Sequence, residues 1–168
     1  PQFAASHTGL TSERVEFDDP VALQEHFHAH GWTDGLPVVP PTPSAVQACL
    51  DWAGLAPDHL IGVEPVRERA ITAEKVAVNA VMAGCTPDAL PVVLAAVEAA
   101  CTDTFNMHGI LATTMGVGPV LVVNGPIRRA LGMNSGINAL GQGNRANSTI
   151  AVATVSLLDG ERISPATT

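Results

Sequence analysis

Aromatic residues are scarce in this sequence: Phe, Trp and Tyr together make up 4% of its 168 residues, and tyrosine is absent. A core with so few rings must be built from small aliphatic side chains, and hydrophobic residues amount to 46% of the chain. Lysine occurs once, at Lys75, and the formal net charge is −8. We therefore expect no basic patch, and we predict neither nucleic acid nor a membrane as a partner.

Long hydrophobic runs are also missing. No apolar run reaches the roughly 18 residues of a membrane-spanning helix, and no signal peptide is visible. Cys49, Cys85 and Cys101 lack the spacing of a zinc site, and three thiols cannot all pair within one chain. Reduced thiols are the simplest interpretation, and they are typical of a soluble cytoplasmic protein.

Capping residues and hydrophobic periodicity predict mostly helices. Asp19 before Pro20, Thr42 and Thr72 each have the form of a helix start. Further helices are expected over residues 86–101 and 145–158, with a short one after Pro126. The β-type runs 107–114 and 119–124 predict strands, the second internal to a sheet because it is fully apolar, and another short strand is indicated near residues 61–66.

Helices outnumber strands in this pattern, so we predict an α+β fold. Several Ala/Val/Leu-rich helices would pack on a small mixed sheet in one domain over residues 18–160. An extended arm (1–17), which we expect to pack on a partner subunit, would precede the domain, and a tail (161–168) would follow it.

The stretch from residue 106 to residue 147 is unusually polar for this chain, with six asparagines among glycines and no acidic residue. Such residues suit a chain that brings amides and bare backbone close to a small ligand. The alternative is that Asn and Gly merely supply turns. We predict ligand binding, and the candidate residues are Asn106, Thr113, Thr114, Asn124, Gly125, Asn134, Asn138, Gly143, Arg145 and Asn147.

Three other side chains are candidates for catalysis. Cys85 lies between two expected helices, where the amides of the second helix could lower its pKa; the alternative is a small buried hydrophobe. His108 could transfer a proton, or it could be a core histidine. Asp34 lies beside Trp32 in a proline-rich loop, where it could orient a histidine or a substrate, or form a turn beneath an anchoring Trp32.

Residues 141–147 (GQGNRAN) place two glycines and Arg145 just before a helix. Exposed amides, the helix dipole and the guanidinium would together hold an anion, which we expect to be a carboxylate. The spacing is neither that of a P-loop nor that of a dinucleotide fingerprint. The alternative is a helix cap formed by Asn144.

Earlier in the chain, His26 and His30 could share a metal, but a solvated helix face is the preferred interpretation because the HExxH pattern is absent.

Four short motifs resemble a bacterial domain family that accompanies proteins with a Sec-Gly-Ser-Cys (UGSC) motif: residues 31–37 (GWTDGLP), 79–85 (NAVMAGC), 123–126 (VNGP) and 145–147 (RAN). The resemblance covers roughly residues 31–155. It implies a soluble small-molecule enzyme or enzyme subunit in thiol- or selenol-assisted chemistry. The chain has no UGSC motif of its own, and Met115, Gly116 and Val117 stand where a His-Pro-Cys-like stretch is expected.

We therefore expect a small-molecule enzyme without an organic cofactor. Arg145 and the glycine loop would hold a substrate carboxylate, His108 would transfer a proton, and Cys85 would attack or assist. The reaction class would be that of a lyase, with cleavage or addition at a carbon–heteroatom bond. If a metal ion is present, Cys85 and His108 would be its ligands, completed by Asp34 or a second subunit.

An alternative of a different class is a non-catalytic accessory subunit that docks onto a UGSC-type partner protein bearing a selenol or thiol. The acidic charge and the extended arm are compatible with this function. We also expect a homo-oligomer, because small-residue helical faces allow close approach of a neighbour. The residues of such a face are Ala95, Ala96, Ala99 and Ala100.

Overall fold

The computed structural model describes residues 9–64 and 68–159. It confirms a single-domain α+β fold in which helices predominate. The helices are α1 (Pro20–Ala29), α2 (Pro43–Ala53), α3 (Ala73–Met82), α4 (Leu90–Ala100), α5 (Met107–Ala112), α6 (Pro126–Ala130) and α7 (Arg145–Asp159), and the 3-10 turns are η1 (Pro87–Ala89) and η2 (Asp103–Phe105). The strands are β1 (Leu60–Glu64) and β2 (Arg69–Thr72).

Side-chain caps begin three of the helices where the sequence predicts them. Asp19 accepts hydrogen bonds from the first-turn amides of α1, and Thr42 and Thr72 each accept one at the start of α2 and α3. Each cap satisfies an amide that has no partner within its own helix. The expected short helix after Pro126 and the last helix from Arg145 are also present, as α6 and α7.

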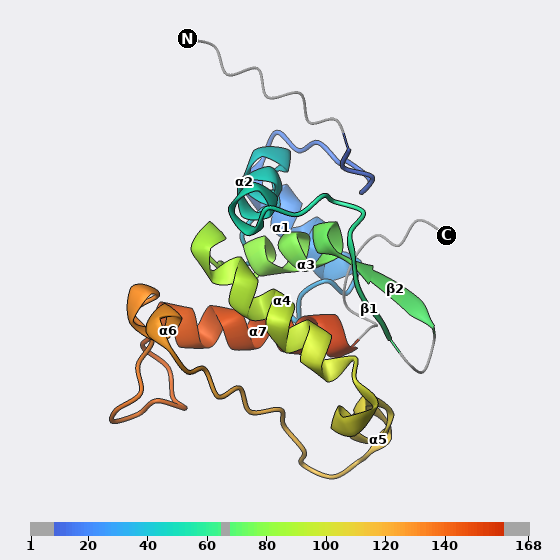
Figure 1. Ribbon diagram of the computed structural model, residues 1–168. Coiled ribbons are helices and arrows are strands. Elements are labelled where there is room, and N and C mark those ends of the chain that lie inside the picture. The colour runs from blue at the N-terminus through green and yellow to red at the C-terminus, as the bar shows by residue number, and fades with distance from the viewer. Residues whose placement is uncertain (1–8, 65–67, 160–168) are drawn as a thin grey trace.

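The core lies between α2, α3, α4 and α7. Helices α3 and α4 pack on each other and on α7, and α2 packs on α3 (Figure 1). Each of these helices turns aliphatic side chains inward, and the bulkiest of those that are fully buried are Leu50, Leu90, Ile150, Val76, Val93 and Val97. Small side chains such as Ala77 and Ala153 bring the helix axes close, which is how a core with few rings is filled.

The sheet is a single antiparallel pair, β1 with β2, and is therefore not mixed within the described residues. Strand β1 matches the expected strand near residues 61–66. The predictions of strands at residues 107–114 and 119–124 are wrong. Residues 107–112 form α5, because Asn106 adopts a left-handed conformation and caps this helix through the amide of Gly109. Residues 119–124 belong to neither a helix nor a strand.

The described part of the N-terminal arm packs on its own chain. The amides of Thr11 and Ser12 donate hydrogen bonds to the Glu74 carboxylate on α3, and Leu10 packs against the core. Residues 1–8 and the predicted tail, 161–168, lie outside the described residues. Among the helices that the structure describes, none combines the length and the hydropathy that crossing a membrane requires.

Candidate functional site

Three segments meet around Cys85: the end of α3, the turn η1 and the first turn of α7. Cys85 follows Gly84, whose positive φ ends α3, and its amide donates to the carbonyl of Ala80 at 2.8 Å. Its side chain is 8% exposed. Cys85 is therefore a buried member of the core cluster, next to the end of α3.

Arg145 is fixed beside this cysteine by the backbone. Its Nε and Nη2 atoms donate to the Gly84 carbonyl oxygen at 3.0 and 2.8 Å. Thr149 lies one turn further along α7, its methyl group is next to Gly84, and its hydroxyl hydrogen-bonds the Cys85 thiol. The sequence analysis did not identify Thr149, although the four-residue spacing from Arg145 places both on one helix face.

Burial dominates the electrostatics of Cys85. It raises the pKa of the thiol, while the hydrogen bond from Thr149 and the positive charge of Arg145 lower it by a smaller amount. The net shift is upward, opposite to the lowering that the amides of the following helix were expected to cause. Burial, and then the charge of an ionised Cys85, raise the pKa of Cys49 to about 11. Both residues are thiols at neutral pH.

The loop before α7 is held by its own amides. The Asn144 carboxamide oxygen accepts from the Asn147 amide at 3.0 Å, and its Nδ2 donates to the Gly132 carbonyl. Asn144 therefore caps α7, as the alternative interpretation has it. Gly143 supplies a positive φ of 116° before the cap. The guanidinium of Arg145 remains exposed at this helix end, next to the cap.

The other asparagines of the loop have structural partners too. Asn147 accepts from the Asn134 amide and donates to the carbonyls of Asn134 and Ala139. Asn138, at a positive φ of 61°, donates to the Gln142 carbonyl. These bonds fold residues 132–147 into a compact loop against α7. Ligand binding by these asparagines stays a prediction. A ligand would have to contact the side-chain atoms that these hydrogen bonds do not use.

We expect Asn147→Ala to loosen this loop and to lower the free energy of unfolding by about 2 kcal/mol, since three hydrogen bonds of roughly 1 kcal/mol or less each are lost. Thermal unfolding, together with hydrogen exchange of the Asn134 amide, measures the effect. Asn124→Ala is the matched control, because Asn124 is exposed and belongs to no helix or strand. Equal stability of the two variants would show that Asn147 does not hold the loop.

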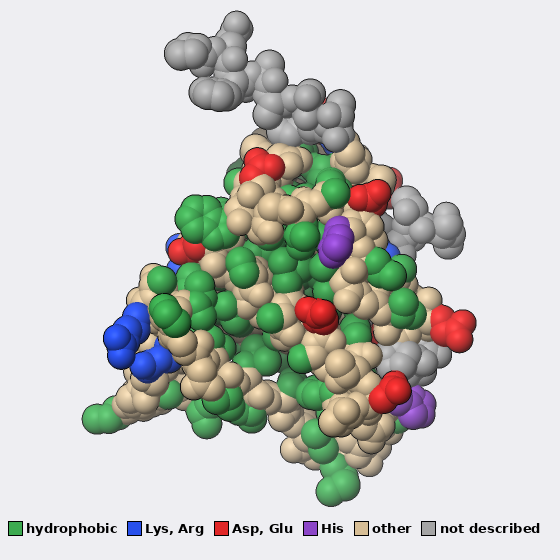
Figure 2. All heavy atoms as spheres, viewed as in Figure 1, with side chains coloured by type: hydrophobic (Ala, Val, Ile, Leu, Met, Phe, Trp, Pro, Cys, Tyr) green, Lys and Arg blue, Asp and Glu red, His purple; other side chains and the backbone are tan. Residues whose placement is uncertain are grey.

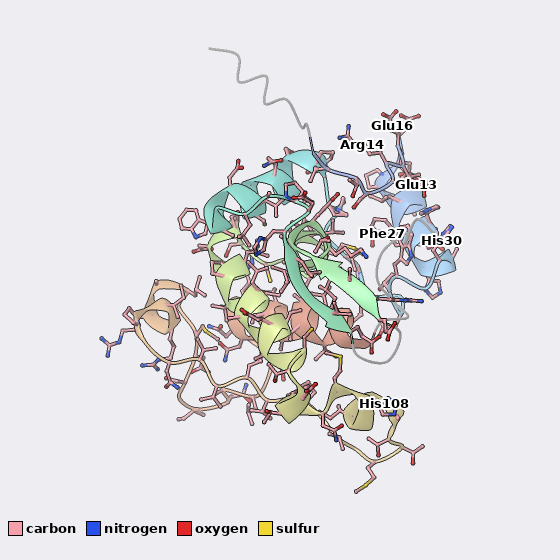
Figure 3. All side chains as sticks on the ribbon, turned by 45° about the vertical axis from the view of Figure 1, so that its right-hand side comes forward. Glu13, Arg14, Glu16, Phe27, His30 and His108 are labelled. Carbon is pink, nitrogen blue, oxygen red and sulfur yellow. The ribbon has the colours of Figure 1, made fainter. Side chains whose placement is uncertain are left out.

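The structure does not bring His108 to Cys85. Cys85 precedes α4 and His108 follows it on α5, so a helix of about 16 Å separates the two side chains. His108 is exposed on α5 at the far end of the helical layer (Figure 3). Thr113 and Thr114 come just after α5, and the Thr113 hydroxyl accepts from the Met115 amide. Within one chain, Cys85 and His108 therefore form neither a proton-transfer pair nor a shared set of ligands.

The remaining candidates lie away from Cys85 in the chain and have local roles. Asn124 and Gly125 lead into α6, where Gly125 has a positive φ of 89°. Asp34 is exposed, and its carboxylate accepts a hydrogen bond from the Leu36 amide. This bond is typical of a turn, which was the alternative role considered for Asp34. Trp32 anchors the proline-rich loop on α1, with its ring centroid 5.5 Å from that of Phe27.

The two α1 histidines belong to this aromatic cluster. The rings of His26 and His30 are 3.9 Å apart, and each lies within 5.5 Å of the Trp32 ring. The His30 ring nitrogen Nδ1 contacts the His26 carbonyl at 2.8 Å. Nearby, Gln24, His28 and Leu36 are among the residues that line a small cavity of about 110 Å³. In residues 9–64 and 68–159, no three His, Cys, Asp or Glu side chains gather as metal ligands.

The junction of α3, η1 and α7 is therefore the place where predicted functional residues come together, as Cys85 and Arg145 with Thr149 added. Comparison of the chain with models of protein families, with curated proteins and with solved structures gives no match.

Proposed function

We propose that this chain is a small-molecule enzyme, or the catalytic subunit of one, that acts on a carboxylate-bearing substrate at Cys85. One observation carries the proposal: the Arg145 guanidinium is held by two hydrogen bonds to the residue next to the cysteine. A fixed, exposed guanidinium is well suited to bind a carboxylate. The Cys85 thiol, which follows Gly84 in the chain, would then lie near the carbon atoms next to the bound carboxylate.

The chemistry that fits these groups is addition to an α,β-unsaturated carboxylate, or the reverse elimination from a β-substituted carboxylate that forms one. In the addition, the Cys85 sulfur forms a bond to the β-carbon, and the π electron pair moves to the α-carbon. The proton released by the thiol ends on that α-carbon, so atoms and charge balance. The reverse step breaks the carbon–sulfur bond, which is a lyase reaction. Burial raises the pKa of the Cys85 thiol and so opposes its ionisation, whereas Arg145 and Thr149 act in the opposite direction and favour the nucleophilic thiolate.

His108 has no role at this site within one chain, because α4 separates it from Cys85. Its catalytic function stays a prediction that requires a second chain. The proposed step uses Cys85 and Arg145, with the Thr149 hydroxyl hydrogen-bonded to the thiol, and it needs no organic cofactor or metal ion. The resemblance to the UGSC-associated family is compatible with thiol chemistry of this kind.

The proposal is tested by incubating the protein with acrylate, maleate and fumarate, and with neutral acrylamide as the uncharged comparison. We expect an adduct at Cys85, detected by peptide mass spectrometry, with an anion-to-acrylamide rate ratio higher than that of a free thiol in solution. Cys85→Ser is the control that should remove it while Cys49 and Cys101 remain. If no anionic reagent has a higher rate ratio at Cys85 than with the free thiol, the enzyme proposal fails and the accessory-subunit function takes its place.

The proposed enzyme also self-associates. The helical face that suggested this is only partly free: Ala95 and Ala99 are exposed on α4, whereas Ala100 is buried against Met107. A larger unpartnered apolar surface lies elsewhere in the chain.

A further inference from the structure

The segment from residue 113 to residue 125 has a strand-like sequence but pairs with no strand in the part of the chain that the structure describes. Val120 and Val122 are 70% and 79% exposed, whereas Leu121 is 37% exposed and Pro119 and Val123 are half-buried. This alternation is the pattern of an extended strand with one face toward the protein. Within the described residues, the backbone groups of 118–123 form no hydrogen bond. An extended chain of this kind is a template for pairing with another strand.

Apolar side chains are exposed on this segment and on the loop that follows α6. Figure 2 shows hydrophobic side chains exposed along the lower side of the molecule, where Figure 1 places this segment. Aliphatic residues that are at least half exposed in this part of the chain are Met115, Val117, Val120, Val122, Ile137 and Leu140. A standard interface takes roughly 800 Å² from each partner, so exposed side chains beyond residues 119–123 would have to contribute to it.

Charge favours a second copy of the chain as the partner. Residues 104–127 contain no Asp, Glu, Lys or Arg, although the whole chain carries a net charge of −8. Two copies would repel each other over most of their acidic surfaces, but not along this segment. A neutral, apolar strand that is unpaired is therefore the surface at which two copies can meet without charge repulsion.

We propose that residues 119–123 pair antiparallel with the same residues of a second copy, with Leu121 on the two-fold axis. In this register Val120 lies opposite Val122 of the other copy, and each pair exchanges two backbone hydrogen bonds. Proline fixes the register, because Pro119 has no N–H and must occupy a position that donates nothing to the ladder. With Leu121 on the axis, residues 119, 121 and 123 are the positions that do not donate, so Pro119 fits.

Pairing would also join valine to valine on the outer face of the ribbon. Each cross-strand pair of this kind contributes roughly 0.2–1 kcal/mol. A ribbon of two strands alone is marginal, so the exposed side chains next to it, such as Met115 and Val117, supply the rest of the buried area. The inference specifies the surface of the proposed self-association and does not depend on the chemistry at Cys85.

Two double variants test the register. Val120→Asp with Val122→Asp places aspartates opposite each other, whereas Val120→Asp with Val122→Lys places each aspartate opposite a lysine. Sedimentation and native mass spectrometry should find a dimer for the wild-type chain, a monomer for the first variant and a dimer for the second. Because both side chains are exposed, thermal unfolding of the monomers should be unchanged.

Hydrogen exchange gives a second readout that non-specific hydrophobic association would not reproduce. The amides of Val120 and Val122 should exchange slowly in the dimer, and those of Leu121 and Val123 quickly. A wild-type chain that stays monomeric at all concentrations would overturn the inference. Equal dimerisation of the two double variants would overturn it as well, because parallel or non-specific association does not distinguish them.

Discussion

Replacing Glu74 with alanine is expected to lower the free energy of unfolding by about 3 kcal/mol, because a buried carboxylate that accepts several hydrogen bonds is lost. Glu74 is 3% exposed, and its oxygens accept from the amides of Thr11 and Ser12 and from the Thr11 hydroxyl at 2.9 to 3.0 Å. Denaturant unfolding measures the change. Glu98→Ala on α4 is the control, because Glu98 is exposed, and it should have little effect.

The same carboxylate gives the protein an acid-sensitive contact. Burial acts to raise the pKa of Glu74, but the hydrogen bonds from Thr11 and Ser12 outweigh it, and the pKa lies below the ordinary value of 4.5. A folded-state pKa below the unfolded one adds stability above the unfolded value, and this stability is lost as the pH falls through the folded value. Wild type should therefore lose more stability than Glu74→Gln between neutral pH and strong acid. Parallel pH profiles for the two proteins would contradict this assignment.

Replacing Arg145 with glutamine is expected to slow alkylation of Cys85 several-fold at neutral pH. Arg145 is one of the two groups that lower the pKa of this thiol against the larger effect of burial. Without its charge, less thiolate is present at a given pH, and the rate profile moves to higher pH. The rate of iodoacetamide labelling at Cys85, followed by peptide mass spectrometry, measures the change. Arg129→Gln on α6 is the control, because Arg129 lies outside the residues that surround Cys85.

An Arg145→Gln variant could instead react faster with the neutral reagent. That result would mean that Arg145 covers the thiol, and that its bonds to Gly84 close the site more than its charge activates it. Arg145→Lys separates the two effects, since lysine keeps the charge but cannot form the paired hydrogen bonds to one carbonyl. The lysine variant should recover the rate if charge is the cause.

Local chemistry made much of the fold predictable. Asp19, Thr42 and Thr72 cap helices where they were expected to, because a cap depends on a few neighbouring residues. The run 119–124 has the composition of an internal strand, yet it pairs with nothing in the described chain. Composition reports a preference for extended backbone, but only tertiary structure, or a second chain, supplies the neighbouring strand.

The candidate site was predictable in part for the same reason. Cys85 and Arg145 were each identified from a local signal, a position between helices and a position at a helix start. Their proximity depends on how α7 packs on α3, which no local pattern encodes. His108 was assigned to the same site because it lies in the same polar stretch, and α4 separates it from Cys85. Glu74 was not identified, because its partners lie more than 60 residues earlier in the chain.

The central claim is that Arg145 directs carboxylates to Cys85, and the ratio of two alkylation rates tests it most directly. Iodoacetate and iodoacetamide differ in charge and hardly in size, and an ordinary thiolate favours the neutral reagent. At low salt, a guanidinium beside the thiol should favour the anion by about 1 kcal/mol, which is about fivefold in rate. The account predicts that the iodoacetate-to-iodoacetamide ratio is higher at Cys85 than for a free thiol in solution, and that Arg145→Gln lowers it. A ratio at Cys85 that is no higher than that of the free thiol, and unchanged in Arg145→Gln, would contradict it.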